Sequence, residues 1–361
     1  WRAPLDEKQP TLAEAFAQGG YVTAGFAANL FYTTWESGLT RGFVHYEDYR
    51  RTWKQVLLST TFLQTNFFWS IAHNLRPMHI LRVLARLDFQ VQPMWTSDRK
   101  LASSVATEFL GWERTRGARP FFAFLNLYDA HLPYEPPNEW SRKFVTDSSR
   151  AVPKEADQDL DVYDGAIAYM DHEVGRILDE LNRRGVLDNT VVVITSDHGE
   201  AFGEHGLYGH GHSLYLPELH VPLVIRYPAR VPAGPRVATA VSLLDLGATL
   251  FDLTGLGVAG SIGGTSLAGS WGGAATPHSP VMSEVSAGVN NAANFPVSRG
   301  AMRSLIDSTG HYIRNGDDVE ELYAYRTDPG ELRDLAKGDS LRVAALRRAA
   351  NQAAGARPTK R

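Results

Sequence analysis

The sequence predicts an α/β fold in which helices cover both faces of a mostly parallel sheet. Apolar runs at Tyr21–Ala28, Phe121–Leu127 and Thr190–Thr195 have the length and the β-branched or aromatic content of strands. The segment Leu160–Arg184 lies between two of these runs and has the apolar spacing of a long helix. Strands that alternate with helices in this way are typical of a parallel sheet.

The first helix and the first strand are placed by local signals. Thr11 and Glu14 match a capping box at a helix start, and Gly19 follows as the helix end. The strand Tyr21–Ala28 comes next. A parallel sheet would have a strand before this helix. We therefore expect that the sequence is truncated before Trp1 and that a first strand is missing.

The middle of the chain continues the alternation. One face of the helix Leu160–Arg184 is expected to carry five apolar residues: Ile167, Met170, Val174, Ile177 and Leu181. A further strand is expected at Val221–Arg226, and a helix at Ser242–Gly255. Residues 256–298 are rich in Gly, Ala and Ser and are predicted to form a loop.

The C-terminal part differs in character and predicts a small antiparallel subdomain. Short strand-like runs around Tyr312 and Tyr323 indicate a hairpin, and the Arg- and Ala-rich tail after Asp339 indicates one helix at most. We expect three parts. A main α/β domain covers 1–298, an antiparallel subdomain covers 299–340, and a tail covers 341–361.

Composition excludes several classes of function. The 361 residues carry 36 Lys and Arg against 40 Asp and Glu, a formal net charge of −4, which argues against a nucleic-acid partner. No cysteine is present, so this sequence holds no disulfide, thiolate metal site or cysteine nucleophile. Residues 56–80 are apolar but interrupted by polar side chains such as Gln64 and His73, which favours core or lid helices over a membrane-surface contact. The cellular compartment is left open.

Polar residues gather directly after the strand Thr190–Thr195. Five of the twelve histidines fall between His198 and His220, and Asp197 precedes the first of them. Ligands of open α/β sheets bind at the carboxyl ends of strands, and an adjacent carboxylate and imidazole suit a divalent cation. We therefore interpret Asp197 and His198 as metal ligands. The alternative is an Asp-His pair that only caps the next element.

A second polar group follows the strand Phe121–Leu127. His131 stands in the segment Tyr128–Tyr134, which the same rule places at the same edge of the sheet. A lone histidine is more often structural, but two strand-end groups at one edge favour a functional role. Histidine can protonate a leaving group near neutral pH. We therefore treat His131 as a candidate catalytic residue.

These segments, taken in order, resemble the sulfatases, a family of the alkaline phosphatase superfamily. The similarity extends over nearly the whole chain and is most specific at 196–221. The matching pieces run from the early helix to a closing hairpin: Pro10–Ala24, Phe121–Tyr134, Ala168–Asp171, Thr190–Glu200, Ser242–Gly255 and Glu321–Glu331. The resemblance implies an alkaline-phosphatase-like sandwich. It also implies metal-dependent hydrolysis of a sulfate ester, carried by a small molecule or a glycan.

The resemblance further implies roles for single residues. Asp197 and His198 match two ligands of one divalent cation, usually Ca²⁺, with Mn²⁺ or Mg²⁺ as alternatives. His131 matches a residue that contacts the transferred group or helps the leaving group depart. His210 matches a position where many relatives place a lysine over the sulfate, and it is expected to be catalytic.

Other parts of the family pattern are weaker or missing. His212 and Asn29 fall near anion-contacting positions and are expected to bind substrate, whereas Glu200 and His205 are expected to shape the loop. The family's nucleophile is a formylglycine made from Cys or Ser in a Cys/Ser-x-Pro-x-Arg motif, and this sequence has no such motif. We expect the motif, together with a pair of acidic metal ligands, to lie upstream of Trp1. The chain alone is then expected to be inactive.

Two alternatives stay open. A neutral histidine at position 210 supplies less fixed charge than a lysine. The first alternative is therefore a phosphodiester or phosphonate hydrolase, or a phosphoglycerol-type transferase, of the same superfamily. The second is a non-catalytic fragment that binds a metal or an anion. A nucleotide site is not indicated, because the glycines at 255–260 follow a helix rather than a strand.

Overall fold

The computed structural model describes residues 4–5, 8–33, 37–48, 99–146, 160–257, 262–271, 280–288 and 292–355. The chain divides into two compact units, one of residues 1–153 with 161–177 and the other of residues 154–160 with 178–361. Residues 56–80, the segment weighed for membrane contact, lie outside the described part. None of the described helices combines the length and the apolar character that crossing a membrane requires.

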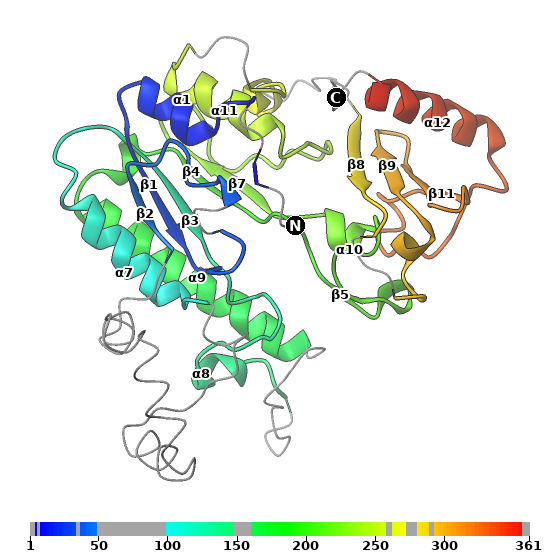
Figure 1. Cartoon of the computed structure of the whole chain (residues 1–361), viewed down its shortest axis with the longest axis horizontal. Helices are drawn as coiled ribbons and strands as arrows, with labels where there is room; N and C mark the ends of the chain where they lie inside the picture. Colours follow the sequence, from blue (N-terminus) through cyan, green and yellow to red (C-terminus); the bar gives the residue numbers. More distant parts are fainter. Residues whose placement is uncertain are drawn as a thin grey trace, which may run out of the picture. The chain divides into compact units, whose positions relative to one another are not determined.

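A three-stranded parallel sheet forms the centre of the first unit. Its strands are β1 (Val22–Ala27), β2 (His45–Glu47) and β3 (Phe121–Asn126), with β1 in the middle (Figure 1). Ala27 pairs with Asn126, so β1 and β3 end at the same edge. All six residues of β1 are buried, which explains why this run is apolar on both faces.

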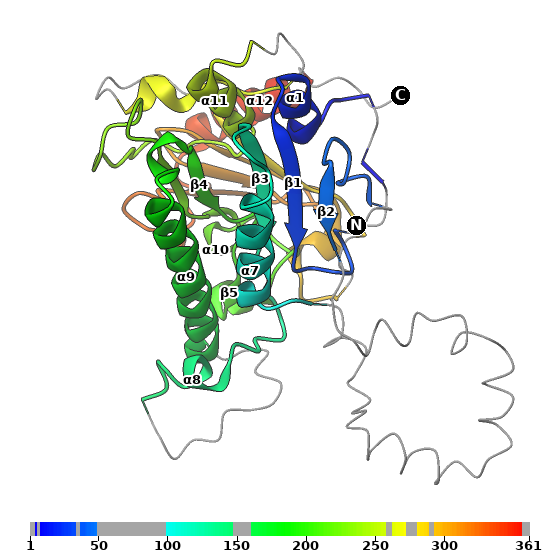
Figure 2. The same cartoon turned by 90° about the vertical axis from the view of Figure 1, so that its left-hand side faces the viewer.

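Two helices flank β1. The helix α1 (Leu12–Gln18) begins at Thr11, whose Oγ1 accepts a hydrogen bond from the Glu14 amide at 3.1 Å. The Glu14 carboxylate accepts one in return from the Thr11 amide at 2.7 Å, so the predicted capping box is confirmed. The helix α7 (Ala102–Glu113) lies across β1 and β3 (Figure 2).

Two further helices belong wholly or partly to the first unit. They are α8 (Asn138–Ser141) and α9 (Leu160–Arg183), and the extent of α9 agrees with the prediction from apolar spacing. Arg176 on α9 donates a hydrogen bond to the carbonyl of Ser103 at 3.1 Å. The helix α9 therefore packs against the first turn of α7.

In the second unit, β4 (Val192–Thr195) pairs with β7 (Leu223–Arg226), and both strands lie where the sequence predicted them. The pair is antiparallel, whereas the alternation of strands and helices predicted parallel strands. The reason is the connection between them, which contains only short elements and no crossover helix: β5 (Ala201–Phe202), β6 (Tyr208–Gly209) and α10 (Leu216–Leu219). Without a crossover, the chain re-enters from the edge at which it left.

The C-terminal part of this unit is a four-stranded antiparallel sheet covered by a helix. The strand order is β11-β10-β9-β8. The strands are β8 (Val281–Val285), β9 (Met302–Ile306), β10 (His311–Arg314) and β11 (Glu320–Tyr323), and the helix is α12 (Ser340–Gly355). The helix α11 (Asp245–Thr254) precedes the sheet in the chain. Short 3-10 helices elsewhere in the second unit are Leu187–Asn189, Glu204–Gly206, Leu267–Ser270 and Pro296–Arg299. The prediction of a loop throughout 256–298 was wrong at β8. This short strand forms because β9 offers it a partner, which local composition does not reveal.

Each face of the antiparallel sheet carries its own apolar cluster. On one face, Leu305 and Tyr312 pack against α12 (Figure 1). On the other face, Met302 and Ile313 pack with Leu214, which comes directly after the histidine-rich segment. The segment that carries the candidate site is thus anchored on this sheet. The domain boundaries proposed from sequence stay predictions.

Candidate active site

Asp197 and His198 follow the end of β4. The Asp197 carboxylate is 86% exposed, the His198 side chain is 31% exposed, and Asp197 Oδ2 lies 3.8 Å from His198 Nε2. Metal–ligand distances of about 2.0–2.6 Å allow two atoms at this separation to bind one ion. The two donors therefore fit a single divalent cation on an open, solvent-facing edge.

The orientation of the His198 ring favours metal binding. Its Nδ1–H donates a hydrogen bond to the carbonyl of Gly199 at 2.8 Å. In the neutral imidazole this leaves the lone pair on Nε2, the nitrogen that faces Asp197. The protein backbone thus selects the tautomer that a metal ligand needs.

Gly199 allows the chain to turn tightly beside His198. A Cβ at this position would come within 2.1 Å of the carbonyl oxygen of Pro217. The Gly199 amide donates to the carbonyl of Glu218 at 2.8 Å. Only glycine lets the backbone approach α10 so closely, so the backbone beside His198 is held against α10.

His210 joins the same group. Its ring stacks on that of His198 with centroids 4.1 Å apart, and its Nδ1 lies 2.9 Å from Glu200 Oε1. Glu200 was expected to shape the loop, and its contact with His210 fits that expectation. Asp197, His198 and His210 are therefore brought together within one unit. Among the described residues, no set of three or more His, Asp or Glu side chains is arranged to hold a metal ion, so a cation at Asp197 and His198 would have two protein donors from this part of the chain.

His212 lies away from this group, in the interior. Its side chain is 1% exposed, its Nε2–H donates to the carbonyl of Tyr208 at 2.9 Å, and its Nδ1 lies 2.7 Å from Glu218 Oε1. The ring also stacks on Phe295 with centroids 4.5 Å apart. The expectation that His212 contacts substrate is not supported, because both ring nitrogens face protein acceptors and the ring is covered.

Glu218 organises the segment between β6 and α10. This carboxylate is buried and accepts hydrogen bonds from the amides of Gly211 at 2.6 Å and His212 at 3.2 Å, and from the Ser213 hydroxyl. Burial by itself lowers the pKa of His212, but the Glu218 carboxylate outweighs it and raises that pKa. Burial likewise opposes ionisation of Glu218, yet His212 and Ser213 bring its pKa below the usual value. The two side chains form a buried ion pair.

His131 lies in the first unit, in the turn after β3. Its Nδ1–H donates to the carbonyl of Leu132 at 2.6 Å, and its ring stacks on Tyr128 with centroids 4.3 Å apart. Arg99 fixes the turn by donating to three successive carbonyls, those of His131, Leu132 and Pro133, at 3.3, 2.9 and 2.7 Å. The ring of His131 is therefore held in one orientation.

Asp129, in the same turn, connects it to α7. It is 2% exposed, and its carboxylate accepts a hydrogen bond from the Ala102 amide at 3.0 Å, at the start of α7. Burial raises the pKa of Asp129 to about 6, although this hydrogen bond and the charge of Arg99 act in the opposite direction. The turn that carries His131 is thus tied to the helix that covers the sheet.

Asn29 stands at the end of β1 and has a structural part in the first unit. Its Oδ1 accepts hydrogen bonds from the backbone amides of Phe31 at 3.1 Å and Tyr32 at 3.0 Å. The backbone N–H of Asn29 donates to Asn126 Oδ1 at 2.9 Å. The carboxamide oxygen is therefore committed to the turn. A substrate contact by Asn29 stays a prediction.

Two residues that shape the site were missed from the sequence. Arg99 stands in a short charged run that reads as solvated surface, but its backbone pairs with Asn29 and its guanidinium holds the His131 turn. Glu218 lies between Pro217 and Leu219 in a four-residue helix, α10. A faint signal existed for Glu218, since it follows the histidine cluster closely, whereas nothing in sequence distinguishes Arg99.

The His212–Glu218 pair predicts a pH window for stability. The pKa of His212 is raised in the folded protein. Its contribution to the free energy of unfolding is therefore complete below the unfolded pKa of 6.5 and is lost as the pH rises through the folded pKa. Because the pKa of Glu218 is lowered, its contribution is present above 4.5 and is lost as the pH falls through the folded value. Glu218→Gln should lower the free energy of unfolding by about 3 kcal/mol near pH 6.

Urea unfolding at pH 4 to 9 checks this prediction. The difference in free energy of unfolding between wild type and Glu218→Gln should shrink toward both ends of this pH range. The control is His220→Gln, a change at an exposed histidine nearby, which should leave the pH dependence of the free energy of unfolding unchanged. A difference that stays constant across the range would mean that the ion pair is not formed.

Comparison with known proteins gives the family. A family model described as Sulfatase matches residues 2–256. Arylsulfatase K of Xenopus laevis is 33% identical over 180 residues, which are 48% of this chain and 33% of that protein. N-acetylglucosamine-6-O-sulfatase of Bacteroides thetaiotaomicron is 38% identical over 106 residues, 29% of this chain and 19% of that protein. The matched part thus spans a third or less of the length of these relatives.

A solved structure supports the fold. The phosphonate monoester hydrolase of Agrobacterium radiobacter superposes with a TM-score of 0.68 over 97% of this chain and 81% of that chain, at 22% sequence identity. The predicted alkaline-phosphatase-like architecture is confirmed by this likeness. Since the family model extends over more than half of the sequence, the chain belongs to the sulfatase family.

Proposed function

We propose that this protein hydrolyses sulfate esters with the help of one divalent cation held by Asp197 and His198. The observation that carries the proposal is the approach of Asp197 Oδ2 and His198 Nε2 to 3.8 Å at the end of β4, in a chain of the sulfatase family. A carboxylate oxygen and a neutral imidazole nitrogen are both available on the solvent side. The arrangement suits a cation that also contacts substrate.

The cation is proposed to be Ca²⁺, with Mn²⁺ and Mg²⁺ as the ions to compare. Carboxylate ligands suit these hard cations, and the imidazole favours Mn²⁺ among them. When bound, the cation would neutralise charge on the oxygens of the transferred group. Two protein donors leave the remaining positions for other ligands or for the ester.

His210 and His131 are proposed to act on the substrate itself. His210, oriented by Glu200 and stacked on His198, would act as the imidazolium, with Nδ1–H on Glu200 and Nε2–H donating a hydrogen bond to an oxygen of the transferred group. His131 has Nδ1 bound to the carbonyl of Leu132, so Nε2 is the atom that would give a proton to the departing alkoxide.

The nucleophile is not supplied by the residues of this sequence. A formylglycine would attack sulfur, but the 361 residues contain no cysteine and no Cys/Ser-x-Pro-x-Arg motif. The proposed roles of Asp197, His198, His210 and His131 are to bind and orient the ester, to stabilise charge and to move the proton.

The substrate is proposed to be a sulfate ester of a small molecule or a glycan. The support comes from the names of similar proteins, one an arylsulfatase and one an N-acetylglucosamine-6-O-sulfatase. A second candidate is the hydrolysis of a phosphodiester or phosphonate. It is favoured by His210, because a histidine places less fixed positive charge over the group than a lysine would.

Sulfatase activity tests the proposal. The protein, expressed from its native gene with a formylglycine-generating enzyme, should hydrolyse p-nitrophenyl sulfate faster than bis-p-nitrophenyl phosphate. Asp197→Asn should lower kcat/KM by about 100-fold or more, because the charge stabilisation is lost. Asp188→Asn is the matched control, since its exposed ion pair with Arg226 contributes little. Full activity of Asp197→Asn would refute the metal site, and a preference for the phosphate diester would support the second candidate.

The leaving group tests His131. Replacing this residue with Gln should lower kcat strongly for an alkyl sulfate, whose alkoxide needs a proton, and only weakly for p-nitrophenyl sulfate. General acid catalysis is worth about 10²- to 10⁴-fold where it is needed. His172→Gln, at an exposed histidine of the same unit, is the control. An equal loss for both esters would show that His131 is not the acid.

A further inference from the structure

The antiparallel sheet carries a buried histidine and glutamate that the proposed chemistry does not use. They are His311 on β10 and Glu331, which follows β11, and both side chains are fully buried. Nδ1 of His311 lies within hydrogen-bond distance of Glu331 Oε1. Among the described residues, Nε2 of His311 is buried without a hydrogen-bond partner. A neutral ring that carries its proton on Nδ1 and donates it to Glu331 therefore leaves no N–H unpaired.

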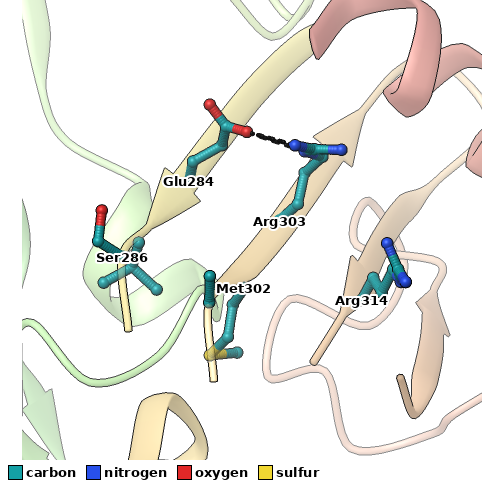
Figure 3. A pocket seen from close by; sticks show the side chains of 7 residues that line it. Glu284, Ser286, Met302, Arg303 and Arg314 are labelled. Atoms are coloured by element: carbon teal, nitrogen blue, oxygen red, sulfur yellow. Dashed lines mark hydrogen bonds and ion pairs between the residues drawn. The ribbon is translucent and has the colours of Figure 1, made fainter. Parts of the chain in front are cut away.

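His311 points to the face of the sheet that packs against the histidine-rich segment. It pairs with Tyr323 on β11, and residues that face each other across two strands share a side of the sheet. Tyr323 packs with Leu214 on that side. The partner of His311 on β9 is an odd number of positions from Arg303, so the Glu284–Arg303 ion pair drawn in Figure 3 lies on the other face.

The second carboxylate oxygen of Glu331 reaches the start of α10. Its Oε2 accepts a hydrogen bond from the backbone N–H of Leu216 at 2.8 Å. The first N–H groups of a helix have no partner within the helix, and the side chain of Tyr215, which precedes α10, does not cap it. Glu331 thus supplies, from a distant part of the chain, the cap that the local sequence lacks.

The backbone of Glu331 has an uncommon conformation. Its φ is 53°, in the left-handed region that residues other than glycine rarely adopt. The carboxylate of Asp328 holds this turn by accepting hydrogen bonds from the amides of Leu332 at 3.2 Å and Arg333 at 2.9 Å. A conformation of this kind persists only where the surrounding contacts impose it, and such positions gather at functional sites.

The helix α10 in turn holds the backbone beside His198. The carbonyl of Glu218 on α10 accepts a hydrogen bond from the Gly199 amide at 2.8 Å. The carbonyl of Gly199 accepts one from Nδ1 of His198, also at 2.8 Å. A continuous series of hydrogen bonds and one short helix therefore leads from Glu331 to the ring of His198, and all of these residues belong to the second unit.

We propose that Glu331, oriented by His311, is a positioning residue for the metal ligand His198. Glu331 fixes the start of α10, α10 fixes Gly199, and the carbonyl of Gly199 turns Nε2 of His198 toward Asp197. Neither Glu331 nor His311 touches the cation or the ester. The inference rests on the proposed function for the cation, whereas the link from Glu331 to Gly199 can be measured without metal.

Leu216→Pro tests the link at a single N–H group. Proline removes the donor that Glu331 binds and is otherwise suited to the first position of a helix. Tyr215 has φ −76° and ψ 162° less five degrees, an extended conformation that a following proline accepts. Leu216→Ala is the matched control, because it also loses the leucine side chain but keeps the N–H. Titration of the 361-residue chain with Mn²⁺ should show about tenfold weaker binding in Leu216→Pro than in Leu216→Ala, the lower end of the loss seen for partners of metal ligands.

Glu331→Gln tests the same link from the other side. A carboxamide has one acceptor oxygen for the two N–H donors of Leu216 and His311, so Mn²⁺ binding should again weaken. Glu284→Gln, the same chemical change on the other face of the sheet (Figure 3), should keep the wild-type affinity. Hydrogen exchange of the Gly199 amide should become faster in Leu216→Pro and Glu331→Gln, while the amides of α12 stay protected, which separates a local loss from unfolding.

The two readouts keep the proposals apart. Weaker Mn²⁺ binding together with faster exchange at Gly199 supports the positioning role of Glu331. Wild-type Mn²⁺ affinity in both Leu216→Pro and Glu331→Gln would overturn it, and so would unchanged exchange at Gly199. Mn²⁺ binding that survives Asp197→Asn would instead refute the proposed metal site, and the exchange at Gly199 would still decide whether Glu331 holds this segment.

Discussion

The candidate active site depends on one buried carboxylate, that of Glu218. It holds the amides of Gly211 and His212, the hydroxyl of Ser213 and the imidazole of His212 at once. A buried charge is costly unless it is paired and fully hydrogen-bonded, and here the pairing fixes the backbone on both sides of it. The backbone of the loop that carries His210 is therefore held by buried hydrogen bonds.

A second set of contacts ties the same loop to the antiparallel sheet. The hydroxyl of Tyr215 donates to Glu321 Oε2 at 2.9 Å, and the amide of Leu216 donates to Glu331 Oε2 at 2.8 Å. Glu331 is buried, and its Oε1 lies within hydrogen-bond distance of Nδ1 of the buried His311. The small C-terminal sheet is thus more than an appendage, because it holds the loop from which the proposed metal ligands and His210 project.

Local signals in the sequence account for much of the fold. The capping box at Thr11 and the helix Leu160–Arg183 are confirmed because their causes, side-chain caps and apolar spacing, lie within a few residues. The strand β8 and the direction of β7 were not foreseen, because they depend on partners elsewhere in the chain.

The candidate site shows the same contrast between features with local causes and features that depend on distant partners. The grouping of Asp197, His198 and His210 could be predicted because polar side chains follow a strand end, where ligands bind in this class of fold, and the structure brings the three side chains together. The burial of His212 could not be foreseen, since it results from Glu218 and Phe295 closing over the ring. A histidine in a cluster is equally compatible with a ligand and with a core ion pair until its partners are known.

Asp197 and His198 are proposed to bind one cation between them, and anomalous scattering from crystals of the chain grown with Mn²⁺ locates that cation. We expect a single strong peak about 2.0–2.6 Å from both Asp197 Oδ2 and His198 Nε2. A peak bound elsewhere, or none beside these two atoms at saturating Mn²⁺, would contradict it.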